Sequence, residues 1–124
     1  MFNKNTKSNS KKNISKHYDL GNEFFSLWLD NSLTYSSAIF ENDKLDLEEA
    51  QINKYQKLTS LIKPKIGDKV LEIGCGWGGF AEFIGKNYDV KLDCITISKK
   101  QFDYAKNRIY KIGLNEKVNI KMQD

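Results

Sequence analysis

The sequence predicts an α/β domain with a parallel sheet, preceded by a helical segment. After residue 67, short apolar runs typical of strands alternate with amphipathic helical patterns. A cluster of glycines stands at the first change from strand to helix, at residues 74–79. A chain of 124 residues, 40% hydrophobic and 29% charged, can also bury the core that such a domain needs.

The positive charge is concentrated at the N-terminus. The chain has 20 Lys and Arg against 16 Asp and Glu, and residues 1–18 contain five lysines and no acid. We interpret residues 1–13 as a basic flexible arm that is either attracted to an anionic lipid surface or solvated without a partner. The rest of the chain has no basic excess, which argues against nucleic-acid binding.

The next segment, residues 14–66, is predicted to be helical. Asn22 can cap a short helix that ends near Asp30, and Asp46 can cap a longer one. Apolar residues after Asp46 recur at mostly helical spacing. Between the two helices, residues 33–40 are typical of a loop or a short helix.

Residues 67–124 contain the alternating part. Three runs are typical of short strands: residues 69–73, 90–97 and 117–122. One helix is expected to follow the glycine cluster and to end near Gly85. A second helix is expected to begin after Ser98 and to run to about Ile112, with Gly113 as its C-terminal stop. Four of its apolar residues are expected to face inward: Phe102, Ala105, Ile109 and Ile112.

The glycine-rich turn is the main signal for function. Glycines let a backbone approach a ligand closely, and the N-terminus of the following helix offers free N–H groups. Gly74, Gly76 and Gly79 fit the G-x-G-x-x-G pattern of dinucleotide sites. With Gly78 in place of Gly79, the same turn fits the G-x-G-x-G loop that binds S-adenosylmethionine. A structural turn without a ligand is the third interpretation.

Three features favour the methyl donor over NAD. Glu72 stands where an acid can pair with the amino group of a methionine moiety. Trp77 is bulky where dinucleotide loops favour small residues. The second strand ends without the acid that usually binds an NAD ribose, since Asp93 lies in mid-strand and is expected to face solvent or a helix.

Four linked segments are typical of a known family: residues 17–25, 33–40, 70–79 and 95–101. Together they resemble the cyclopropane fatty acid synthase family, a branch of the class I S-adenosylmethionine-dependent methyltransferases, from about His17 to Asp124. The resemblance implies an incomplete Rossmann-like class I methyltransferase fold, with the first three parallel strands and their helices after an N-terminal helical cover. Residues 14–66 would then cover the active site, and residues 67–124 would form the first half of the cofactor-binding domain.

The resemblance also implies a set of site residues. Those expected to bind S-adenosylmethionine are Tyr35, Ser36, Glu72, Gly74, Cys75, Gly76, Gly78, Thr96, Ile97, Gln101 and Asp124. Tyr18, with the aromatic run Phe24, Phe25 and Trp28, would belong to the cover over an acyl pocket. The aromatic residues have an alternative as plain core, and Cys75 has one as a small residue in a tight loop.

The implied reaction transfers a methyl or methylene group to the double bond of an unsaturated acyl chain of a phospholipid. Bicarbonate would accept a proton from the added methyl group. Ser37, where many members of the family have Cys, would help to hold this bicarbonate. This serine weakens the choice of cyclopropanation over simple methylation. The alternatives are a methyltransferase for an amine or another small molecule, an NAD-binding half-domain, and a membrane-surface or partner-binding module.

Composition bears on the setting of the protein. The sequence has no apolar membrane span and no signal-peptide core, and Cys75 and Cys94 lack metal-type spacing. We therefore expect a cytoplasmic protein, peripheral at the inner membrane face, and leave homo-oligomerisation open. The family's domain has about seven strands, so we expect this chain to be part of a larger enzyme, inactive alone, with an open edge at its first strand.

Overall fold

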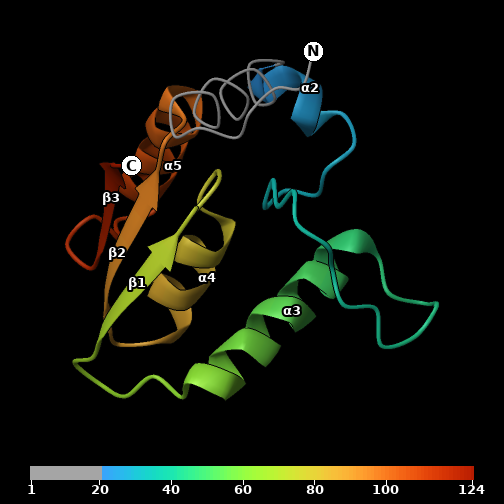
Figure 1. Cartoon of the computed structure of the whole chain (residues 1–124). Helices are drawn as coiled ribbons and strands as arrows, with labels where there is room; N and C mark the ends of the chain where they lie inside the picture. Colours follow the sequence, from blue (N-terminus) through green and yellow to red (C-terminus); the bar gives the residue numbers. More distant parts are fainter. Residues whose placement is uncertain (1–20) are drawn as a thin grey trace, which may run out of the picture.

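The computed structural model describes residues 21–124, so the basic arm and Tyr18 lie outside the described residues. Helices and strands follow in the order α2 (Asn22–Ser26), α3 (Leu47–Ile62), β1 (Lys69–Ile73), α4 (Gly79–Asn87), β2 (Lys91–Thr96), α5 (Lys99–Lys111) and β3 (Val118–Met122) (Figure 1). In this part of the chain, no helix has the length and apolar character needed to cross a bilayer.

The predicted α/β class is confirmed. The three strands form one parallel sheet in the order β1–β2–β3, with α4 and α5 as the crossover helices. Glu72 pairs with Cys94, and Cys94 pairs with Ile120. All strands point the same way, so their carboxyl ends share the edge where ligands bind in open α/β sheets. The glycine-rich turn leaves β1 at that edge.

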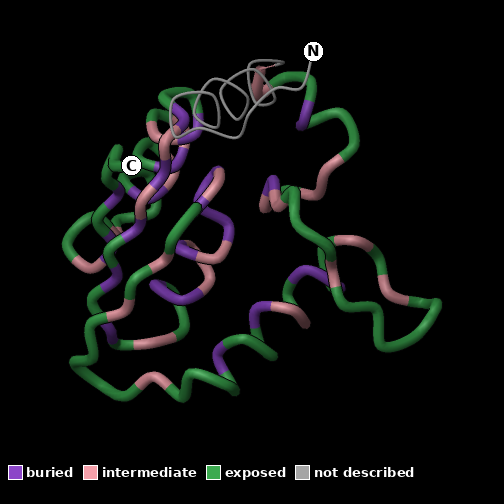
Figure 2. Tube along the Cα trace, in the orientation of Figure 1, coloured by how far each residue is buried: buried purple, intermediate pink, exposed green. Residues whose placement is uncertain are grey.

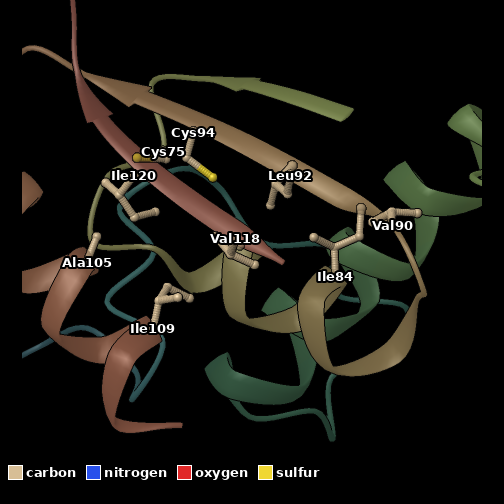
Figure 3. Close-up of a cluster of buried hydrophobic side chains, with 10 residues drawn as sticks. Cys75, Ile84, Val90, Leu92, Cys94, Ala105, Ile109, Val118 and Ile120 are labelled. Carbon is tan, nitrogen blue, oxygen red and sulfur yellow. The ribbon is translucent and has the colours of Figure 1, made fainter. Parts of the chain in front are cut away.

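The main hydrophobic core lies between the sheet and the helices α4 and α5. Leu92 and Cys94 face it from β2, Ile84 comes from α4, and Ala105 and Ile109 come from α5 (Figure 3). Alternating residues of β2 are buried and exposed, as expected for a strand with one covered face (Figure 2). Apolar burial on this face is therefore the main source of stability for the sheet.

The other face of the sheet is uncovered in residues 21–124. Leu71 and Ile73 of β1 lie on it with 58% and 76% of their surface exposed, opposite Asp93 and Ile95 in register. Asp93 forms an ion pair with Lys121 of β3, which confirms that it faces solvent. Within the described part of the chain, β1 pairs only with β2, so its second edge is open.

The helical segment follows its sequence signals in part. Asp46 caps α3, and Glu49 completes a reciprocal capping box with it, as the sequence predicts for the cap. Asn22 does not cap α2, because its side chain instead accepts a hydrogen bond from the Trp77 indole at 2.7 Å. This helix stops at Ser26, and Asp30 starts a turn by accepting the Ser32 N–H.

Two expectations for the later helices were wrong. Helix α4 runs past Gly85 to Asn87, and a Cβ on Gly85 would lie 2.9 Å from side-chain atoms of Leu114 and Val118. Gly85 therefore permits close packing rather than ending the helix. Ile112 is 36% exposed, not inward-facing, because the chain leaves helical geometry at this residue.

Candidate functional site

The glycine-rich turn is held against the end of β2. The N–H groups of Gly74 and Cys75 both donate to the carbonyl oxygen of Ile95, at 2.9 and 3.0 Å. Gly74 and Gly76 have φ of +79° and +54°, and a Cβ on either would meet no atom within 4 Å. Their backbone therefore faces open space, and a ligand can approach it closely.

A cavity of about 460 Å³ opens beside this turn. Its walls come from the loop at residues 33–36, one face of α3, the strand β1 and the turn itself. Seven of the predicted site residues line it together: Tyr35, Ser36, Glu72, Gly74, Cys75, Gly76 and Gln101. Residues far apart in the sequence thus converge on one space, as a binding site requires.

Five predicted site residues do not line the cavity. Gly78 caps α4, and a Cβ there would lie 3.2 Å from the Ala105 Cβ, so this glycine serves packing against α5. Thr96 is buried at the end of β2, where its hydroxyl donates to the Gln101 side chain at 3.0 Å. Ile97 follows it and is partly exposed, whereas Ser37 and Asp124 are exposed. Their roles remain predictions.

Glu72 supplies an unusual carboxyl group to the cavity wall. Burial raises its pKa to about 7, against a hydrogen bond from the Cys94 thiol that lowers it. Contact with the Cys75 thiol, burial and the nearby Glu72 carboxylate all raise the pKa of Cys94, which stays a thiol. Near neutral pH, Glu72 can therefore exchange between a proton and a cationic partner.

Helix α3 contributes polar residues that could not be predicted from the sequence. Gln51 is 2% exposed, and its amide donates to the carbonyl oxygens of Thr34 and Ser36 at 3.1 and 2.9 Å. Lys54 lines the cavity, as does Tyr55, whose hydroxyl bonds to that of Thr34. The only available signal was their spacing on one face of the helix, which does not reveal what they meet.

An aromatic cluster joins α2 to the turn. Phe25 and Trp77 are buried with ring centroids 4.8 Å apart, and Tyr35 lies edge-on to Phe25 at 5.7 Å. Phe25 is therefore core, whereas Phe24 and Trp28 keep almost half of their surface exposed. The cluster places the Tyr35 loop next to the turn.

Arg108 of α5 fastens the same region. Its guanidinium donates to the carbonyl oxygens of Asn31 and Ser32, each at 2.7 Å, and to that of Trp77 at 3.3 Å. It also pairs with Glu82, whose pKa burial would raise but hydrogen bonds from Lys86 and Arg108 lower overall. One side chain thus ties α4 and α5 to the loop that begins the cavity wall.

Comparisons with known proteins find a family model and relatives that match most of the chain. The family model for mycolic acid cyclopropane synthetase matches residues 5–124. A probable fatty acid methyltransferase of Pseudomonas putida is 40% identical over 90% of this chain and 28% of its own length. The cyclopropane-fatty-acyl-phospholipid synthase of Escherichia coli K12 is 43% identical over 88% of this chain and 27% of its own.

The fold also has counterparts among solved structures. The mycolic acid cyclopropane synthase CmaA1, complexed with SAH (S-adenosylhomocysteine) and CTAB, aligns with a TM-score of 0.85 and 33% identity. The alignment covers 90% of this chain and 39% of that one. The chain thus spans under a third of the two curated relatives and about two fifths of the solved one.

Proposed function

Because the chain belongs to the mycolic acid cyclopropane synthetase family, we propose that it forms the S-adenosylmethionine-binding part of a methyltransferase acting on the double bond of an unsaturated acyl chain. The observation that supports this most is the convergence of the Tyr35–Ser36 loop, Glu72 and the open glycine backbone on one cavity. The names of the relatives support an acyl acceptor.

The residues present fit such a cofactor. The backbone of Gly74 and Gly76 leaves room for the methionine end, and the Glu72 carboxyl can accept a hydrogen bond from its amino group. Gln101 reaches the same space from the start of α5. Thr96 ends strand β2, Ile97 follows it, and Asp124 lies beyond the end of β3. At this carboxyl edge we propose that the ribose and adenine bind.

When bound, the cofactor supplies a sulfonium methyl group that is already a strong electrophile. The work left to the protein is to position an acceptor and to exclude water. Leu58, Ile62 and Ile73 give the cavity an apolar wall suited to an acyl chain. For ring closure, a proton must leave the added methyl group, and we propose that the exposed Ser37 hydroxyl helps to hold bicarbonate as its acceptor.

The proposal extends to where the reaction occurs. Unsaturated phospholipid is found in membranes, so we propose a cytoplasmic enzyme that meets its substrate at the inner membrane surface. The lysines of residues 1–18 would favour an anionic surface by about 1 kcal/mol each.

Two measurements on the intact protein test the proposal. Calorimetric titrations should show binding of S-adenosylhomocysteine and none of NAD; the reverse result would assign a dinucleotide site. Transfer of a labelled methyl group should then be followed with vesicles of unsaturated phospholipid, with saturated vesicles as the control. Transfer to amines but not to unsaturated lipid would refute the acyl acceptor and leave the methyl donor in place.

A further inference from the structure

We infer that Lys54 is a positioning residue that turns the Ser36 hydroxyl into a hydrogen-bond donor for the carboxylate of the bound nucleotide's amino-acid end. The inference rests on the proposed function and adds a role for α3 in it. It is based on the contact between the Lys54 ammonium and the hydroxyl of Ser36, a residue that lines the cavity.

Two side chains of α3 attach the loop at residues 34–36 to this helix. The Lys54 Nζ donates to the Ser36 carbonyl oxygen at 3.3 Å and to the Ser36 Oγ at 2.8 Å. Gln51, one turn earlier, donates to the carbonyl oxygens of Thr34 and Ser36. The backbone on both sides of Tyr35 is therefore fixed, and Lys54 alone of these two residues also bonds to a side chain of the loop.

The hydrogen bond between Lys54 and the Ser36 hydroxyl can run in one direction only. A lysine ammonium has only donors, so the Ser36 oxygen must act as the acceptor. The serine proton is then free for another partner, and within residues 21–124 the Ser36 hydroxyl donates to no other protein atom. Since Ser36 lines the cavity, an acceptor on a ligand is the natural partner for this proton.

The Lys54 ammonium also places a positive charge beside the cavity. Lys54 also lines the cavity; burial lowers its pKa, and the carboxylate of Asp30 opposes that shift. A hydroxyl that accepts from a cation is a stronger donor, and an anion nearby is stabilised by the same charge. Glu72 lines the same cavity and suits an ammonium group. The two ends of an amino acid thus have separate partners, Glu72 for the amino group and Ser36 with Lys54 for the carboxylate.

The test compares two nucleotides in calorimetric titrations of the intact protein. S-adenosylhomocysteine carries the carboxylate, and its decarboxylated analogue keeps the amino group but lacks the carboxylate. In the Lys54→Met variant we expect the affinity for the first to fall about tenfold or more and that for the second to stay unchanged. Lys57→Met removes an exposed lysine from the same helix and should change neither affinity.

A second variant separates this role from simple folding of the loop. Ser36→Ala keeps the Lys54 side chain and the hydrogen bonds from Gln51 to the loop backbone. It should show the same loss of affinity for S-adenosylhomocysteine and no loss for the decarboxylated analogue. If Lys54→Met weakens both nucleotides equally, or neither, the inference is overturned while the proposed function stands. If the unmodified protein binds neither nucleotide, the proposed function itself fails.

Discussion

Gln51 is the residue on which the geometry of the Tyr35 loop most directly depends. Replacing it with Leu keeps the volume but leaves the carbonyl oxygen of Thr34 without its donor and that of Ser36 with the Lys54 ammonium alone. We expect the free energy of unfolding to fall by about 1–3 kcal/mol in urea titrations. Gln56→Leu, an exposed glutamine on the same helix, should change it by less than about 0.5 kcal/mol. Equal effects of the two variants would contradict this assignment.

Glu72 should make stability depend on pH. Its pKa in the folded protein is about 7, above the ordinary value of 4.5, so folding favours the protonated form. Its contribution is full below pH 4.5 and is lost as the pH rises through 7. Between these values, wild-type stability should therefore decline relative to Glu72→Gln in urea titrations.

Glu82 provides the control for that measurement, because its pKa is lowered overall. Its contribution is present above the ordinary value of 4.5 and is lost only as the pH falls through its folded pKa. The difference between wild type and Glu82→Gln should stay flat from pH 4.5 to 7. A parallel decline for both variants would assign the effect to another group.

Gly76 should be indispensable for nucleotide binding. Valine at this position would adopt a φ of +54°, at a strain of about 1–3 kcal/mol, and its side chain would enter the cavity. We expect Gly76→Val to abolish S-adenosylhomocysteine binding in calorimetry. Gly67→Val carries a similar strain, with φ of +83°, but lies outside the cavity. It should lower stability and leave the affinity intact.

Site residues whose role depends on local spacing could be predicted from the sequence. Glu72, Gly74 and Gly76 belong to one short strand–turn motif, and all three line the cavity. Lys54 and Tyr55 also line it but were missed, because only the folded chain brings α3 against the Tyr35 loop. A helical periodicity shows that such residues face inward without showing their partners.

Among the elements, capping signals predicted helix starts better than helix ends. Asp46 and Ser98 cap their helices as expected, since a cap bonds to backbone only three residues away. The end of α4 was misjudged because Gly85 is needed for close packing against Leu114 and Val118, which are distant in the sequence. The start of α2 was misjudged because the Asn22 side chain accepts a hydrogen bond from the Trp77 indole.

Arg108 should hold the elements around the cavity together. Arg108→Leu removes donors to three carbonyl oxygens and leaves Glu82 without one of its cations. We expect a loss of about 2–4 kcal/mol in the free energy of unfolding, with faster hydrogen exchange at residues 31–36. Lys111→Leu, at an exposed position of the same helix, is the matched control. Unchanged exchange in Arg108→Leu would show that α3 and the aromatic cluster hold the loop without Arg108.

At the scale of the whole molecule, the sheet has one covered face and one open edge within residues 21–124. Parallel sheets normally carry helices on both faces, so the uncovered face with Leu71 and Ile73 favours self-association. In sedimentation velocity at high protein concentration, Leu71→Lys should reduce the fraction of larger species. Asn119→Lys adds the same charge to a polar position on this face and should reduce it less. Equal reductions would point to net charge rather than to the apolar edge.

The hydrogen bonds from Trp77 to Asn22 and from Arg108 to Ser32 also affect when parts of the chain can fold during synthesis. They join residues 55 and 76 positions apart. On the ribosome, Asn22 and Ser32 emerge first, and their hydrogen bonds form only after Trp77 and Arg108, respectively, have left the exit tunnel. Closing such long loops is slow compared with forming the individual helices. The Asn31–Ser32 end of the cavity wall is therefore synthesised early but gains its last hydrogen bonds only after Arg108 has emerged.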